Sequence, residues 1–115
     1  MVDSRGAHLD DVFGAVADPT RRAILDTLAR GEVTVGELAA RFPISLNGVS
    51  KHIRVLERAG LITRDVRGRE HRLSFDARPL EDAAAWMERY RAFWESRLDA
   101  LEGLIKSRKR TRRTR

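Results

Sequence analysis

Polar and basic side chains recur along one stretch of the chain at a spacing that a helix would gather on one face. An advance of about 100° per residue places five of them opposite an apolar stripe: Asn47, Ser50, Lys51, Arg54 and Arg58. Asparagine can pair a donor and an acceptor with adenine, lysine and arginine can donate to guanine, and serine can bond to bases or phosphates. The set indicates contact with double-stranded DNA, and a merely solvated helix face is the alternative.

The residues around this set predict a helix over Ser45–Arg58. Ser45 can cap the N-terminus, and Gly60 can end the helix. Four apolar residues form the face expected to be buried: Leu46, Val49, Ile53 and Leu56. The capped N-terminus directs its free N–H groups toward a phosphate, and Gly48 lets a backbone approach closely.

Three shorter patterns predict the helices that precede this one. The first helix ends near Ala17, and Asp18-Pro19 then reads as an N-cap followed by a proline at the first position of a second helix. Gly31 closes that second helix. Thr34 begins a T-x-x-E capping box that opens a third helix, which Pro43 stops. The third helix and Ser45–Arg58 therefore form two helices joined by a tight turn.

Residues 62–75 alternate apolar and polar side chains around Arg67-Gly68-Arg69, which predicts a β-hairpin. Four arginines lie in or beside it: Arg64, Arg67, Arg69 and Arg72. An Arg-Gly-Arg tip suits a minor groove or its flanking phosphates, although charge can also simply protect an edge strand from aggregation. Two short helices followed by this hairpin predict a mostly α fold with a small β-hairpin, the winged helix-turn-helix, whose second helix enters the major groove.

A single helical pattern runs from Leu80 to Ile105, and its apolar surface is about twice as wide as a helix needs to cover its own domain. The surplus predicts pairing with a second copy of the chain, unless the first helix and the hairpin absorb it. The predicted dimer interface comprises Leu9, Val12, Phe13, Val16, Met87, Tyr90, Trp94, Leu98, Leu101 and Ile105. Aromatic residues around Trp86, Tyr90 and Trp94 could also line a pocket for a small molecule.

Length and charge predict one folded domain over residues 1–105 and a basic disordered tail over 106–115. The net charge of +6 is unevenly distributed. Residues 45–75 carry seven Lys and Arg against three acidic residues, and the tail carries seven basic residues and no acidic one. Without the tail the net charge is −1, so the local placement of charge indicates an acidic partner.

Several function classes lack the residues they need. The 115-residue chain has no cysteine, which excludes thiol catalysis, disulfides and cysteine metal sites. His8, His52 and His71 are too scattered to predict a zinc site, so neither a metal nor another cofactor is expected. No nucleophile with a base and no phosphate loop is visible, which predicts that the protein is not an enzyme. No secretion signal or membrane-length apolar run is present, so a cytoplasmic location and no membrane partner are expected.

Four stretches resemble, in order and in spacing, the ArsR-type winged-helix repressors: DPTRRAIL, VGELAARF, ISLNGVSKHIRVLERAGLI and GREHRLSF. The resemblance covers residues 9–105. It implies a homodimer that represses transcription at a DNA operator and is released when a small-molecule inducer alters the dimer. The family positions that read bases fall on Leu46, Asn47, Ser50, Lys51 and His52.

Two features depart from the family pattern. Leu46 stands where a polar residue is usual. Glu32–Glu37 holds no thiol and the last helix no histidine, so the chain resembles a branch without the metal site. The predicted elements and the resemblance together give these expected DNA contacts: Ser45, Leu46, Asn47, Gly48, Ser50, Lys51, His52 and Arg54 of the helix, and Arg64, Arg67 and Arg69 of the hairpin. A two-fold dimer predicts a palindromic operator. The competing hypothesis is that the chain is a winged-helix module that binds protein or RNA without specific DNA readout.

Overall fold

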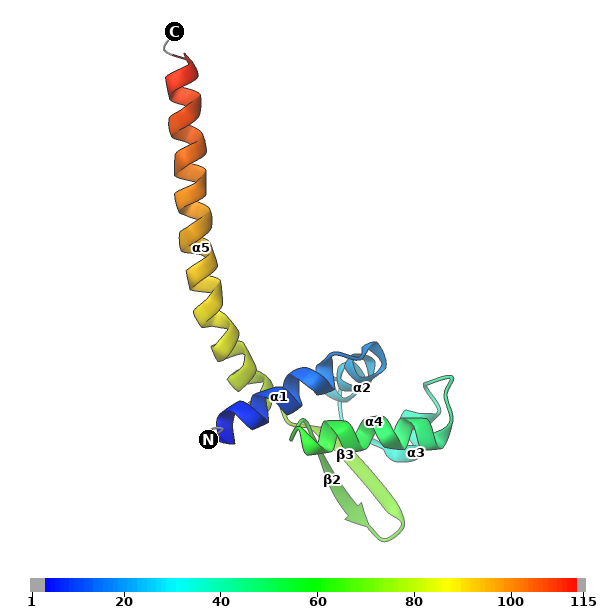
Figure 1. Ribbon diagram of the computed structural model, residues 1–115. Coiled ribbons are helices and arrows are strands. Elements are labelled where there is room, and N and C mark those ends of the chain that lie inside the picture. The colour runs from blue at the N-terminus through cyan, green and yellow to red at the C-terminus, as the bar shows by residue number, and fades with distance from the viewer. Residues whose placement is uncertain (1–3, 114–115) are drawn as a thin grey trace. The chain divides into compact units, whose positions relative to one another are not determined.

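The computed structural model describes the backbone of residues 4–113 and the side chains of residues 8–108. The chain forms two compact units, Met1–Ala83 and Ala84–Arg115. The first unit contains helices and a small sheet (Figure 1). Its elements are α1 (Ser4–Val16), α2 (Pro19–Ala29), β1 (Val33–Thr34), α3 (Val35–Ala39), α4 (Leu46–Arg58), β2 (Ile62–Arg67), β3 (Glu70–Phe75) and the first residues of α5 (Arg78–Arg113).

Side-chain caps fix the starts of the three middle helices. The Asp18 carboxylate accepts a hydrogen bond from the Arg21 backbone N–H at 3.0 Å, and the Thr34 hydroxyl accepts one from the Glu37 N–H at 3.1 Å. The Ser45 hydroxyl accepts from the Gly48 N–H at 3.1 Å. Each bond satisfies a backbone donor that has no partner inside the helix. The three predicted helix starts are therefore confirmed.

The core of the first unit lies where α1, α2 and α4 meet the sheet. The helices turn their apolar faces inward, and the side chains that are fully buried include Val12, Ile24, Ile53, Leu56, Leu61 and Leu73. Leu9, Phe13 and Val16 of α1 are half-buried against this cluster. The described side chains that are buried are all apolar, so the unit is stabilised mainly by removing apolar surface from water.

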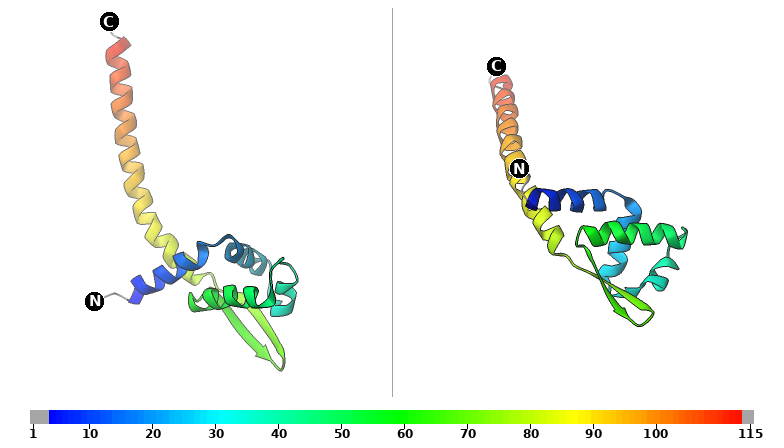
Figure 2. Two further views of the ribbon diagram at one scale, coloured as in Figure 1. Left: turned by 45° about the vertical axis from the view of Figure 1, so that its right-hand side comes forward. Right: turned by 60° about the horizontal axis from the view of Figure 1, so that its bottom comes forward.

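The sheet has three antiparallel strands in the order β1-β3-β2. The hairpin β2–β3 confirms the predicted one, and Gly68, with φ +63°, takes the first central position of its two-residue turn. The hairpin projects to a free tip in each view of Figure 2. The sequence did not predict β1, because two residues are too few for an alternating pattern; β1 is defined by pairing with distant residues, Val33 opposite Leu73.

Two helix ends differ from the prediction. Helix α3 ends at Ala39 rather than at Pro43, because the N–H groups of Arg41 and Phe42 bond to carbonyls three residues back. Helix α5 continues to Arg113, so at least residues 106–113 are helical where a disordered tail is expected. A salt bridge of 3.4 Å between Glu102 and Lys106 spans the predicted boundary at helical spacing.

Together these elements confirm a mostly α winged helix-turn-helix. Helices α3 and α4 form the two-helix unit, and β2–β3 forms the wing. The first turn of α5 belongs to the same unit, since Pro79 and Ala83 are buried there. From Ala84 onward, α5 forms the second unit.

Candidate nucleic-acid interface

Helix α4 presents one face to the core and the opposite face to solvent. Val49, Ile53 and Leu56 are fully buried, which fixes the rotation of the helix about its axis. The outward positions are then set by the helical period: Asn47, Lys51, Arg54 and Arg58 are exposed, and Ser50 is half-buried. The structure thus gathers the five predicted polar residues on one side of a single rigid element.

The cations of this face have no partners within the described part of the chain. No hydrogen bond or ion pair there involves the side chains of Lys51, Arg54 or Arg58. These side chains are therefore available to donate to phosphates or to guanine edges. In the wing, by contrast, Arg64, Arg67 and Arg72 each form an ion pair with a carboxylate.

At the N-terminus of α4, the predicted cap is present, but Leu46 does not lie on the buried face where the sequence places it. A Cβ at Gly48 would lie 3.3 Å from the Ser45 hydroxyl oxygen and 3.7 Å from the Ile44 side chain. Glycine at this position therefore makes room for the cap. Leu46 is 59% exposed and does not belong to the buried face; it directly follows the cap, before the helix reaches the core. Its exposed methyl groups suit apolar contact with a thymine methyl.

His52 faces α2. Its Nδ1 lies 3.2 Å from a guanidinium nitrogen of Arg21 and 4.0 Å from a carboxylate oxygen of Asp18. The backbone N–H of Arg21 bonds to the Asp18 carboxylate and lowers the pKa of that group, and the charges of Arg21 and His52 lower it further. His52 is thus tied through Nδ1 to the start of α2.

Arg21 connects three helices and was missed by the sequence reasoning. Its guanidinium donates to the carbonyl oxygens of Ala15 at 2.7 Å and Gly14 at 3.0 Å, at the end of α1. Together with the contact to His52, these bonds hold α1, α2 and α4 in one arrangement. The available signal was the position of Arg21 within DPTRRAIL, three residues after the cap that the sequence does reveal.

The wing arginines fall into two groups. At the base, Arg64 is paired with Glu57 at 2.7 Å, and Arg72 with Glu70 at 2.9 Å and Glu32 at 3.3 Å. At the tip, Arg67 is 73% exposed despite an ion pair with Asp65, and the exposed side chain of Arg69 has no partner among the described residues. The tip therefore offers its cations to solvent, whereas the base uses them within the protein.

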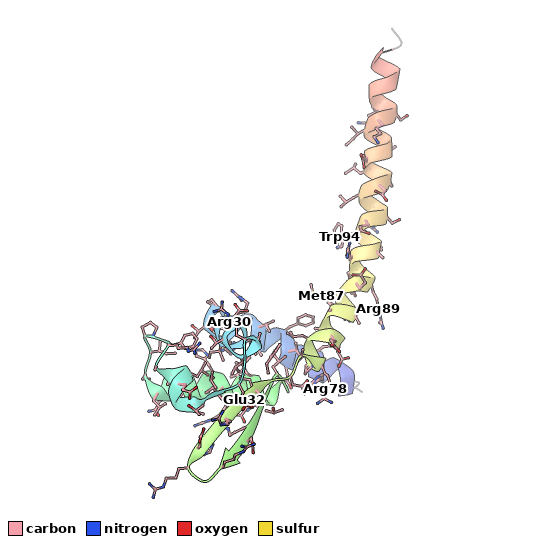
Figure 3. The ribbon with its side chains drawn as sticks, turned by 180° about the vertical axis from the view of Figure 1, so that it is seen from behind. Arg30, Glu32, Arg78, Met87, Arg89 and Trp94 are labelled. Carbon is pink, nitrogen blue, oxygen red and sulfur yellow. The ribbon has the colours of Figure 1, made fainter. Side chains whose placement is uncertain are left out.

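The second unit carries the apolar part of the predicted interface. Its large apolar side chains are exposed by 39–64%: Trp86, Met87, Tyr90, Phe93, Trp94, Leu98, Leu101, Leu104 and Ile105. Met87 and Trp94 lie on one side of α5, with Arg89 on another (Figure 3). The α1 residues of the predicted interface differ from these, since Val12 is fully buried in the core of its own chain. Val12 therefore supports the fold rather than offering surface to a partner.

A shallow hollow of about 270 Å³ lies along α5, lined by Trp86, Arg89, Tyr90 and Phe93. Trp86 and Tyr90 have ring centroids 4.7 Å apart, and the Arg97 guanidinium lies 4.3 Å from the Phe93 ring centre.

Among the described residues, no three His, Cys, Asp or Glu side chains are grouped to hold a metal ion. None of the described helices is long and apolar enough to cross a membrane.

Comparisons with known proteins agree with this geometry. Residues 16–65 match the model of a helix-turn-helix domain family. The chain is 38% identical to the transcriptional repressor SdpR of Bacillus subtilis over 79 residues, 69% of this chain and 88% of the relative. It is 37% identical to the HTH-type transcriptional regulator Rv2034 of Mycobacterium tuberculosis over 98 residues, 85% of this chain and 89% of the relative.

The chain is also similar to solved structures of ArsR-type transcriptional regulators. A crystal structure of the ArsR family transcriptional regulator RHA00566 is 38% identical, with a TM-score of 0.75 and coverage of 84% of this chain and 98% of that one. An ArsR-like transcriptional regulator from Rhodococcus sp. RHA1 is 36% identical, with a TM-score of 0.72 and coverage of 85% and 92%.

Proposed function

Because this chain belongs to the ArsR family of DNA-binding winged-helix transcriptional regulators, we propose that it represses transcription as a homodimer on a two-fold symmetric operator. The observation that carries the proposal is the outward face of α4, whose cations are unpaired within the described residues. Asn47, Ser50, Lys51 and Arg54 read base edges in the major groove. Leu46 contributes an apolar contact at the start of the helix.

The wing supports this contact from the side. Arg67 and Arg69 stand at its exposed tip, where they reach the minor groove or the phosphates that flank it. Such contacts add affinity and fix the register of α4 on the duplex, but they carry little sequence information. The basic residues 106–115 add further affinity that does not depend on sequence.

The exposed apolar residues of α5 support the dimer. A continuous apolar surface of this length is unusual on a monomer in water. Met87, Trp94, Leu98, Leu101 and Ile105 recur at intervals that keep them within one narrow stripe of the helix. The same helix of a second copy covers this stripe under two-fold symmetry. Such a dimer holds two α4 helices for successive major-groove faces of one duplex.

Selection of bound duplexes from a random pool tests the proposal. We expect the intact protein to enrich an imperfect palindrome whose half-site centres lie about ten base pairs, or a multiple of ten, apart. A pool with no enriched sequence would indicate a module without specific DNA readout. Placing the enriched operator upstream of a reporter gene then tests repression: co-expression of the protein should lower expression, and an increase would indicate activation.

The hollow on α5 favours a second role, response to an inducer. The close, tilted rings of Trp86 and Tyr90 lie beside Arg89, whose side chain has no partner among the described residues, and the three together suit a small aromatic carboxylate. We propose that such a molecule binds there and weakens the dimer. Salicylate should quench tryptophan fluorescence saturably in the wild type, and Arg89→Ala should weaken that binding. Quenching that is linear in salicylate and equal in both proteins would contradict the role.

A further inference from the structure

One side-chain cluster joins α4 to the wing. Arg64, in the middle of β2, donates from Nη2 to the Oε1 atom of Glu57 at 2.7 Å and from Nε to Oε2 at 3.3 Å. Its Nη1 lies 3.1 Å from Nδ1 of His71 on β3. All three guanidinium nitrogens are therefore used, and Glu57 belongs to the last turn of α4. The bidentate geometry fixes orientation as well as distance.

The register of the hairpin explains why Arg64 reaches α4. Side chains two residues apart lie on the same face of a strand, so Arg64 shares its face with Ile62, which is 3% exposed. Its cross-strand partner is Leu73, which is fully buried. Arg64 is thus on the face of the hairpin that turns toward the core. Its side chain is 29% exposed, against 73% for Arg67 near the tip.

Glu57 is the only acidic residue in Leu46–Arg58. A carboxylate on a helix that contacts DNA repels the phosphates, so by charge alone Glu57 should weaken binding. The ion pair with Arg64 offsets that repulsion and gives the carboxylate a second effect, which is to fix the hairpin against the helix. Contact of α4 and the wing tip with the same duplex requires a defined angle between them.

We propose that Arg64 is a positioning residue: through Glu57, it holds the wing at the angle to α4 that DNA binding requires, and it does not contact phosphate. This revises the sequence-based prediction, in which Arg64 contacts DNA directly. The inference rests on the proposed function, because it requires that α4 and the wing bind the same duplex.

The salt dependence of operator binding and the removal of the Glu57 charge distinguish a positioning role for Arg64 from direct contact with phosphate. The experiment measures the affinity of the intact protein for its selected operator at several salt concentrations, in the wild type, Arg64→Ala, Glu57→Gln, the double variant and Arg69→Ala. We expect Glu57→Gln to weaken binding about three- to tenfold although it removes a negative charge. Arg64→Ala should weaken binding similarly and leave the slope of log K against log salt unchanged. The double variant should bind no more weakly than either single variant.

Arg69→Ala is the matched control, because it removes an arginine of the same hairpin that has no protein partner among the described residues. It should make the slope shallower by about 1.8, because a homodimer loses one phosphate contact at each of its two wings, at about 0.9 per contact. The charge-swapped pair Glu57→Arg with Arg64→Glu should bind more tightly than either swap alone. Thermal unfolding of every variant shows whether a loss of binding reflects loss of the fold.

Two results would overturn the inference: Glu57→Gln binding as tightly as the wild type or more tightly, or Arg64→Ala making the slope shallower by the same amount as Arg69→Ala. Failure of the wild type itself to prefer its selected operator over random duplex would instead contradict the proposed function. The two failures are therefore distinguishable in one set of titrations.

Discussion

The exposed apolar stripe of α5 and the exposed polar face of α4 are surfaces of opposite kinds. On α4 the apolar residues Val49, Ile53 and Leu56 are fully buried within the chain, and the exposed face is polar and cationic. On α5 every described residue from Ala84 to Arg108 is exposed, and one stripe of them is apolar, with Leu98 and Trp94 each 58% exposed. An unpaired cation is well solvated in the absence of DNA. Exposed apolar surface, in contrast, raises the free energy by about 25 cal/mol per Å² for as long as it faces water.

The comparison indicates that the two helices need different partners. The α4 face can remain in water and bind DNA reversibly, with strong salt dependence. The apolar stripe of α5 favours cover by another apolar surface. A regulator that must leave DNA while remaining folded is expected to divide its surfaces in this way.

Disrupting the α5 face should produce the largest effect. In Leu101→Asp, an unpaired carboxylate would lie in the proposed interface, where burial of a charge is costly. We expect a monomer at micromolar concentration by light scattering. Affinity for the two-half-site operator should fall at least about 100-fold, because linked binding of two half-sites is lost. Asp99→Ala, on the opposite side of α5, is the control; a Leu101→Asp protein that stays dimeric would contradict the assignment of this face.

Removing the cations of α4 should have the next largest effect. Lys51→Ala and Arg54→Ala should each cost ~1–3 kcal/mol of operator binding if the side chains meet bases, and less if they meet only phosphates. Arg30→Ala removes an exposed arginine outside the proposed interface and should change little. If the double variant binds as the wild type does at matched salt, α4 does not read DNA.

Arg21→Ala tests how α4 is held. The substitution removes the bonds to Ala15 and Gly14 and the contact with His52. We expect a loss of ~1–2 kcal/mol in the free energy of unfolding, measured by denaturant titration. Arg22→Ala is the comparison, since Arg22 donates one side-chain bond, to Val16 at 2.8 Å, and should cost less. Equal losses in the two variants would mean that the link to α4 adds nothing.

Deleting residues 106–115 should weaken binding to operator and random duplex alike. The segment holds seven basic residues and no acidic one, so its contribution is to phosphates, and we expect a loss of about two- to fivefold with a shallower salt slope. Anisotropy titrations with both duplexes measure it. Selective loss for the operator would show that the segment takes part in sequence readout.

The smallest predicted effect concerns pH at the start of α5. The Arg78 side chain and backbone N–H bond to the Asp76 carboxylate and lower its pKa to about 2. Because the folded-state pKa is below the ordinary value of 3.8, this pair stabilises the fold above pH 4, and the contribution is lost as pH falls through about 2. NMR titration should give that midpoint, and Arg78→Ala should raise it. A wild-type midpoint near 3.8 would show that the pair does not form in solution.

Much of the fold is visible in the sequence because it depends on local chemistry. Asp18, Thr34 and Ser45 reveal helix starts because a cap involves residues three positions apart. Gly68 reveals the hairpin because its φ of +63° suits glycine. The buried face of α4 follows from a period that Val49, Ile53 and Leu56 share. Leu46 fits the same period yet is exposed, because it is the first residue of the helix and lies beside the cap, one turn before the buried Val49.

The parts that the sequence did not reveal depend on contacts between distant residues. Strand β1 exists through pairing with β3. The partners of Arg64 and His52 lie on other elements, so residue type alone could not distinguish an arginine that binds phosphate from one that holds the wing. The continuation of α5 beyond residue 105 shows the reverse error: high charge suggested disorder, although lysine and arginine are good helix formers.

A change in operator spacing tests the central claim, that α5 fixes two α4 helices for one duplex, most directly. Inserting five base pairs between the selected half-sites turns one of them by about half a helical turn. We predict that affinity of the intact protein falls about 100-fold, and that footprinting then protects one half-site instead of two. Equal affinity for both spacings, or a single protected half-site on the original operator, would contradict the account.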